Sequence, residues 1–298
     1  MNHHPTTQPR AAGTILAAAL CATASLASLA SAATIALASP TTAWHAVSYS
    51  GIYPDYITDQ QTGQAEGDIV GNAQHPAFYT QFDNGGTPTL ADDWLAFRVR
   101  LGGNKPPPEF TSFAHVGFDA NLDGALDLFA SVGREGSKDI LTLCWPGTGA
   151  NVSPSTTSIV SKTPINQYAA TTTNYRWEAI TLALDPTATN LDLDGTGDTD
   201  YFLSWQIPFE AAVTALQSKG ISITESTHLG LVLATSTQPN SLNQDLNGPN
   251  GGTNSSSTWA TLGAISTPVG ANGVVPEPAV AGLLLLAAAG LLRRRRRA

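Results

Sequence analysis

Short apolar stretches, alternating or continuous, run through the middle of the chain and predict β-strands. In residues 94–101, Phe97, Val99 and Leu101 alternate with Arg98 and Arg100, the period of two expected of a half-buried strand. Turn-forming clusters such as Asp83-Asn-Gly-Gly separate the stretches. Strands are predicted at 77–82, 94–101, 112–118, 127–132, 140–145, 175–184, 201–207 and 228–235.

One helix is predicted, over residues 208–219. Pro208 suits the first turn, an apolar stripe follows at helical spacing, and Gly220 fits a C-cap. The segment 238–258 is rich in Asn, Gly and Ser and is predicted to be a long surface loop. Eight strands with one short helix favour an all-β fold, a β-sandwich or jelly roll, as a single domain over residues 33–268.

The N-terminus carries the pattern of a secretory signal peptide. Residues 11–30 hold no charge, and Ala30-Ser31-Ala32 fits a small-residue cleavage site. We interpret residues 1–32 as a signal helix that the Sec machinery uses for export. The alternative is a buried alanine-rich helix.

The C-terminus has three parts. An uncharged stretch, 279–292, follows Pro276, Glu277 and Pro278 and precedes the arginine cluster of Arg293, Arg294, Arg295, Arg296 and Arg297. Fourteen helical residues rise about 21 Å, which is less than the roughly 30 Å hydrocarbon core. Arginines at the end of such a helix can nevertheless snorkel and hold a span at the cytoplasmic face.

This order of Pro-Glu-Pro, apolar helix and arginine cluster resembles the PEP-CTERM sorting signal of Gram-negative bacteria. Over residues 269–298, the resemblance implies a C-terminal transmembrane helix, recognition by an exosortase and cleavage near Pro276-Glu277-Pro278. It also implies a protein anchored in the inner membrane before sorting, and then located at the cell surface or in the extracellular matrix, often with extracellular polysaccharide. The alternative is a plain membrane anchor. Both readings place residues 33–275 outside the cytoplasmic membrane.

Charge is distributed unevenly along the chain. The formal net charge is −9, but six of the 14 basic residues are Arg10 and Arg293–Arg297, so the segment between them carries 8 basic and 23 acidic side chains. Its net charge of −15 repels nucleic acid and attracts cations.

Once residues 1–32 are removed, Cys144 is the only cysteine, which excludes an internal disulfide and suggests a small packed side chain.

A second resemblance concerns the fold. The sequence Tyr201-Phe-Leu-Ser-Trp-Gln-Ile-Pro208-Phe, the helix after it, and Leu229-Gly-Leu-Val-Leu resemble DOMON-like and family 9 carbohydrate-binding-module-like sandwiches. The resemblance covers about 35 residues and implies the β-sandwich fold. It carries over no ligand-contacting residue.

Two acidic loops repeat one spacing. Oxygen-bearing side chains occupy positions 1, 3, 5 and 9, with glycine at position 6 and a backbone carbonyl available at position 7. The first loop has Asp119, Asn121, Asp123, Ala125 and Asp127, and the second has Asn190, Asp192, Asp194, Thr196 and Asp198, followed by Asp200.

The loops are similar to the short DxDxDG calcium loops of secreted repeat proteins. Alternate oxygens around a sharp turn can surround one hard cation, and Ca²⁺ is preferred over Mg²⁺, which keeps its waters. The alternative is a pair of hairpin turns in which Asp, Asn and Gly supply turn geometry. A third partial copy, from Asn243 to Gly248, has Gly251 at position 9 and is interpreted as a turn.

No catalytic motif emerges from the sequence. It contains no Gly-x-Ser-x-Gly, His-Glu-x-x-His, Walker or dinucleotide motif.

Among the tryptophans, Trp145 is the best candidate for an exposed ring that stacks on a sugar. These features favour an exported, exosortase-sorted, non-catalytic surface or matrix protein, stabilised by calcium, with polysaccharide as a candidate ligand. The alternatives are a secreted glycan-acting hydrolase and a purely structural matrix protein.

Overall fold

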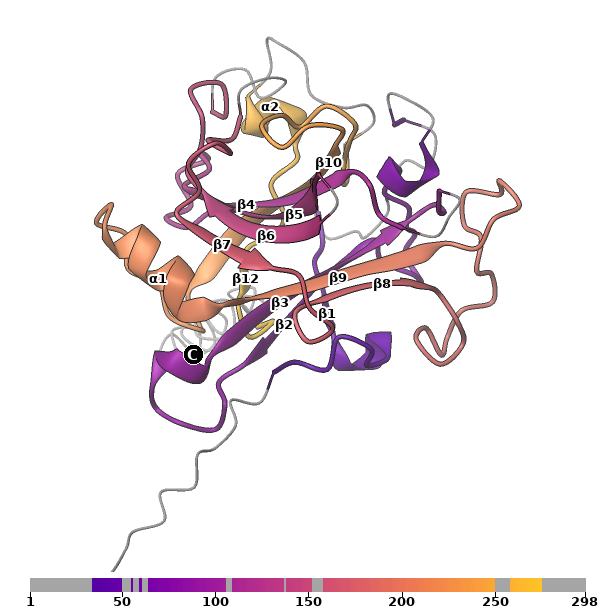
Figure 1. The fold of residues 1–298 in the computed structure, drawn as a ribbon, viewed down its shortest axis with the longest axis horizontal. Helices are drawn as coiled ribbons and strands as arrows, with labels where there is room; N and C mark the ends of the chain where they lie inside the picture. Colours follow the sequence, from indigo (N-terminus) through magenta and orange to yellow (C-terminus); the bar gives the residue numbers. More distant parts are fainter. Residues whose placement is uncertain are drawn as a thin grey trace, which may run out of the picture. The chain divides into compact units, whose positions relative to one another are not determined.

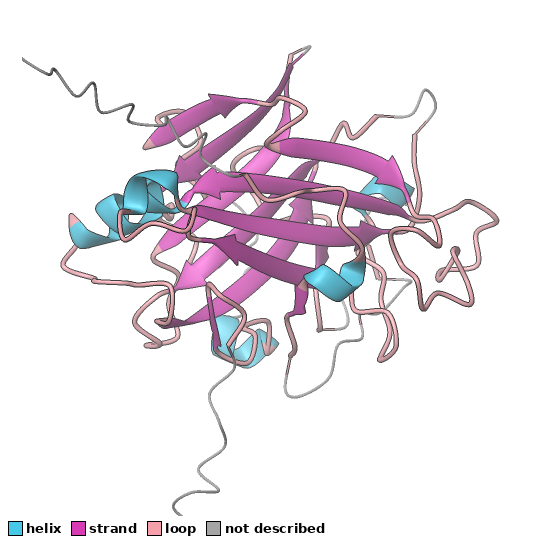
Figure 2. Cartoon of the chain, turned by 90° about the horizontal axis from the view of Figure 1, so that it is seen from below, coloured by secondary structure: helices cyan, strands magenta, loops and turns pink. Residues whose placement is uncertain are grey.

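Two antiparallel β-sheets dominate the computed structural model, an arrangement consistent with a β-sandwich (Figures 1 and 2). The structure describes residues 34–49, 55, 59–60, 64–105, 109–136, 138–151, 158–249 and 258–274. All of them belong to the unit formed by residues 32–298. The predicted signal helix (1–32), the Pro-Glu-Pro motif (276–278), the apolar stretch (279–292) and the arginine cluster (293–297) lie outside the described residues.

Each sheet has a simple antiparallel order. The first is β1-β2-β3-β9-β8, and the second is β11-β10-β4-β5-β6-β7, with β12 paired to β10. The first sheet consists of β1 (His45–Ala46), β2 (Phe78–Asp83), β3 (Trp94–Leu101), β9 (Tyr201–Pro208) and β8 (Tyr175–Ala179). The second consists of β11 (Asp245–Leu246), β10 (His228–Ser236), β4 (Phe113–Asp119), β5 (Leu128–Glu135), β6 (Lys138–Cys144), β7 (Asn166–Ala169) and β12 (Val269–Gly270).

All eight predicted strands are present, and so is the predicted helix, α1 (Phe209–Gln217). The strand predicted at 175–184 is shorter and ends at Ala179. The strands that the pattern missed have only two to four residues each, too few to show a period. A one-turn helix, α2 (Trp259–Leu262), and the 3₁₀ turns Thr41–Ala43, Ala65–Gly67 and Leu90–Asp92 complete the described elements.

The main core lies between the two sheets. Phe97 of β3 packs 5.5 Å from the ring of Trp205 on β9 and 5.8 Å from the ring of Phe118 on β4. Helix α1 closes one end, where Phe209 meets Phe82 edge to face. Val269 and Ala271 also belong to this core, so the packed body continues through β12.

The outer face of the first sheet is covered as well. Arg98 and Arg100 are both fully buried, whereas the alternating pattern predicted a half-buried strand. Residues 34–44 and 180–184 lie over this face in a second apolar cluster that includes Trp44. The Arg98 guanidinium stacks 4.2 Å from the Trp44 ring and donates hydrogen bonds to the Ser204 hydroxyl and to the carbonyls of Leu37 and Ser39.

The outer face of the second sheet is covered by residues predicted to be solvated. Within 238–258, Leu242, Asp245 and Leu246 are buried, and the last two form β11 against β10. The prediction of a long surface loop is therefore wrong for these residues. The apolar positions are too sparse for a sequence pattern, but Leu242 and Leu246 join Trp259 in one cluster.

The side chain of Cys144 is a packing residue, as predicted. It is buried at the end of β6 in the cluster that contains Phe129 and Val232. Burial raises the pKa of its thiol, so the side chain stays a neutral apolar group.

His115 on β4 is expected to make the protein sensitive to acid. Its ring is buried with Nδ1 2.7 Å from the Ser131 hydroxyl, and burial lowers the pKa of His115 to about 3. An unfolded histidine binds a proton below about pH 6.5. Between about pH 6.5 and pH 3, therefore, only the unfolded chain gains this proton, and the stability falls as the pH falls.

The free energy of unfolding should thus lose up to about 1.4 kcal/mol per pH unit from this group below pH 6.5. The measurement is urea unfolding of the wild type and of His115→Gln from pH 7 to pH 4. We expect the free energy of unfolding to fall less steeply with decreasing pH in the variant than in the wild type. Parallel slopes would show that His115 does not titrate between the two states.

Candidate metal-binding site

The second acidic loop brings three of its predicted ligands together. Asp192, Asp194 and Asp200 each place one carboxylate oxygen so that the three oxygens lie within 4.8 Å of one another. Asp200 is fully buried immediately before β9, whereas Asp192 and Asp194 are half-buried. Asn190 is bonded within the loop to Asp192, and Thr196 and Asp198 are exposed.

The loop turns sharply because Gly195 adopts a φ of 72°, which few other residues tolerate. The turn aims backbone amides at Asp192, whose oxygens accept hydrogen bonds from Gly195 N (2.8 Å) and Gly197 N (2.9 Å). The hydrogen bond with Asp194, helped by these amides, lowers the pKa of Asp192. Burial, and then Asp192, raises the pKa of Asp194. The two carboxyl groups can therefore share a proton that a bound cation would replace.

Asp200 is fixed by a buried ion-pair network. Arg100 Nε lies 2.7 Å from Asp200 Oδ2, and Arg100 Nη1 lies 3.0 Å from Asp185 Oδ2, which also contacts His75 Nδ1 at 3.0 Å. Burial raises the pKa of Asp200 to about 6 in spite of Arg100. The network ties the acidic loop to β3 through Arg100.

The first acidic loop has a different geometry. Asp119 accepts from the amides of Asp123 (3.1 Å) and Gly124 (2.9 Å), and Asp127 accepts from Ala120 N (2.9 Å). Asn121 Oδ1 and Asp123 Oδ1 likewise accept from amides of the loop, those of Asp123 and Ala125. The acidic side chains of this described loop do not converge as those of the second loop do. Its hydrogen bonds fit the hairpin-turn alternative, and calcium binding there stays a prediction.

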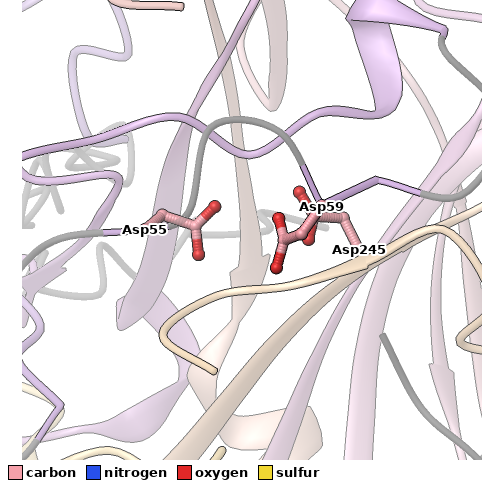
Figure 3. A group of neighbouring side chains, drawn as sticks. All are labelled: Asp55, Asp59 and Asp245. Carbon is pink, nitrogen blue, oxygen red and sulfur yellow. The ribbon is translucent and has the colours of Figure 1, made fainter. Parts of the chain in front are cut away.

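A group of three carboxylates that sequence reasoning missed lies elsewhere. Asp55, Asp59 and Asp245 also place one oxygen each within 4.8 Å of the others (Figure 3). Asp245 belongs to the third partial copy of the loop motif, which was interpreted as a turn. Asp55 and Asp59 belong to no motif, and nearly two hundred residues separate them from Asp245. Only the partial motif around Asp245 could have signalled the site.

Trp145 is partly buried rather than freely exposed. Its ring borders a groove of about 460 Å³ that also involves Tyr168, Asn166 and Glu210. The Lys219 ammonium lies 4.7 Å from the ring centroid, so one region of the ring already has a partner. A stacking role for Trp145 stays a prediction.

Glu178 lies in a separate groove of about 350 Å³ that also includes Glu109, Asp139 and Trp177. Glu178 pairs with Arg176 at 2.5 Å, and Glu109 pairs with Arg134.

Comparison with protein-family models, with curated proteins and with solved structures finds no match for this chain. Among the described residues, no helix has both the length and the apolar character needed to cross a membrane.

Proposed function

We propose that this chain is an exported, non-catalytic β-sandwich protein of the cell surface or extracellular matrix, stabilised by calcium and sorted by an exosortase. The observation that carries the calcium assignment is the convergence of Asp192, Asp194 and Asp200 at one end of β3 and β9. The export assignment rests on the sequence of the two ends, a signal helix and a C-terminal membrane-spanning helix before the arginine cluster.

Calcium would act on the 190–200 loop by neutralising its carboxylates. Arg100 is the only basic side chain of the described residues that pairs with this group, and it contacts Asp200 alone among the three. A divalent cation balances the remaining charge and holds the loop against the sheet. Calcium sites of extracellular modules work at about 10⁻⁴–10⁻³ M, so the site would fill after export.

A non-catalytic role agrees with the pairing of two of the three carboxylates in the Glu178 groove, the third being Asp139. Glu109 and Glu178 are each paired with an arginine, as described above. The Trp145 groove combines an aromatic ring with the amide of Asn166 and the carboxylate of Glu210, groups that suit the apolar faces and hydroxyls of a polysaccharide. Polysaccharide is accordingly the ligand class that we propose for this surface.

Cell fractionation tests the export assignment. In a Gram-negative host with an exosortase, we expect the wild-type chain outside the cytoplasm, shortened at both ends, with the C-terminal cut near Pro276-Glu277-Pro278 by mass spectrometry. Replacement of Arg293–Arg297 by alanine should remove the cytoplasmic anchor and leave C-terminally uncut chain in the cell. Arg176→Ala, an exposed arginine of the β-sandwich, is the control and should sort as the wild type does. Intact wild-type chain in the cytosol, with both termini uncut, would refute the assignment.

A further inference from the structure

Asp55, Asp59 and Asp245 meet where two distant segments approach each other. Asp245 lies on the edge strand β11, and its two oxygens accept hydrogen bonds from Ile69 N and Leu246 N, both at 2.7 Å. Asp55 reaches the same region, because its Oδ1 accepts from Gly248 N at 2.8 Å. The side chain of Asp55 points toward the other two carboxylates (Figure 3). Backbone amides thus fix two of the three carboxylates from outside the group.

Burial leaves part of this group without a hydrogen-bond donor. Asp55 is 6% exposed and Asp245 is 0% exposed. Among the described residues, Asp55 Oδ2 is buried and accepts no hydrogen bond, and the same holds for Oδ1 of the neighbouring Asp68, which is 3% exposed. A buried carboxylate oxygen without a donor costs about 1–3 kcal/mol or more, so a missing partner is indicated.

Asp55 and Asp245 have no ion-pair partner among the described residues. The basic side chains that form ion pairs in the described part of the chain do so with carboxylates other than Asp55 and Asp245. Burial, followed by the neighbouring carboxylates Asp59 and Asp68, raises the pKa of Asp245 to about 8. Several carboxylates brought this close favour protonation unless a cation lies between them.

We propose that Asp55, Asp59 and Asp245 bind one divalent cation, with Ca²⁺ as the ion that suits them best. Their donors are all oxygens, which favour hard cations. Two oxygens on opposite sides of a calcium ion lie about 4.6–5.2 Å apart, since Ca–O bonds measure about 2.3–2.6 Å, and the spacing within 4.8 Å is compatible with one ion. The unpartnered Oδ2 of Asp55 supplies a free ligand atom.

The ion would connect Asp55 and Asp59 to Asp245 of β11, at the edge of the second sheet. The site is separate from the Asp192–Asp194–Asp200 site of the proposed function and goes beyond it. Burial, and then the carboxylates of Asp194 and Asp59, raise the pKa of the neighbouring Asp68 to about 7.

Calorimetric titration of the metal-free full chain with CaCl₂ tests the proposal. We expect two bound ions per wild-type chain, and one fewer in Asp55→Asn and in Asp245→Asn. Asp55→Asn keeps an acceptor for Gly248 N, so it should fold even if Asp245→Asn does not, and far-ultraviolet circular dichroism checks this. Asp139→Asn, a half-buried carboxylate outside both groups, is the control and should bind as the wild type does.

The variants separate this proposal from the proposed function. If Asp55→Asn keeps the wild-type number of ions while Asp192→Asn loses one, the new site is refuted and the loop site stands. If Asp192→Asn binds normally while Asp55→Asn loses an ion, the new site stands and calcium at the loop is refuted. Wild-type binding by both variants refutes both sites.

Discussion

Replacing Arg100 with methionine is expected to lower the free energy of unfolding by about 3–5 kcal/mol, the usual cost of removing one partner of a buried ion pair. Arg100 is fully buried and donates to both Asp200 and Asp185. Without it, two buried carboxylates lose their common cation, and His75 is the only described ion-pair partner that remains for Asp185. Total stabilities of domains are about 5–15 kcal/mol, so the loss is large.

Urea unfolding followed by tryptophan fluorescence measures this loss. The control is Arg176→Met, because Arg176 pairs with Glu178 but its side chain is 45% exposed, and exposed pairs contribute at most about 1 kcal/mol. Arg100→Lys retains the charge without the planar fork and should fall between the wild type and Arg100→Met. If Arg100→Met fails to fold, the loss of unfolding free energy is measured on Arg100→Lys instead. A loss for Arg100→Met as small as that for Arg176→Met would contradict the network.

The sheets could be predicted because their strands carry local patterns. β3 coincides with its predicted range, and α1 lies inside its own. The coverings of the sheets could not be predicted, because they depend on contacts between distant segments. Arg98 alternates with apolar neighbours just as a solvent-facing residue would, yet residues 34–44 bury it. Nothing near Arg98 in sequence distinguishes these two environments.

The acidic loops also show what the sequence could and could not predict. Asp192, Asp194 and Asp200 are neighbours in sequence, and their spacing around Gly195 was sufficient to group them. Asp119, Asp123 and Asp127 share the spacing, but amides of their own loop satisfy Asp119 and Asp127. The spacing alone cannot separate these outcomes.

Calcium is expected to raise the melting temperature substantially. An ion present at 100 times its dissociation constant stabilises the folded state by about 2.7 kcal/mol per site. For a domain of 150–250 residues, each kcal/mol shifts the melting temperature by about 2–4 °C. One occupied site should thus add about 5–10 °C, and two sites more, provided that the unfolded chain does not bind the ion.

The most direct test of calcium stabilisation is scanning calorimetry of the full chain in CaCl₂ and in EGTA, with MgCl₂ as the matched divalent control. We predict that the chelator lowers the melting temperature by at least about 5 °C, that magnesium restores little of the difference, and that the double variant Asp55→Asn/Asp192→Asn responds to neither ion. A wild-type chain that melts at the same temperature in calcium and in EGTA would contradict the account.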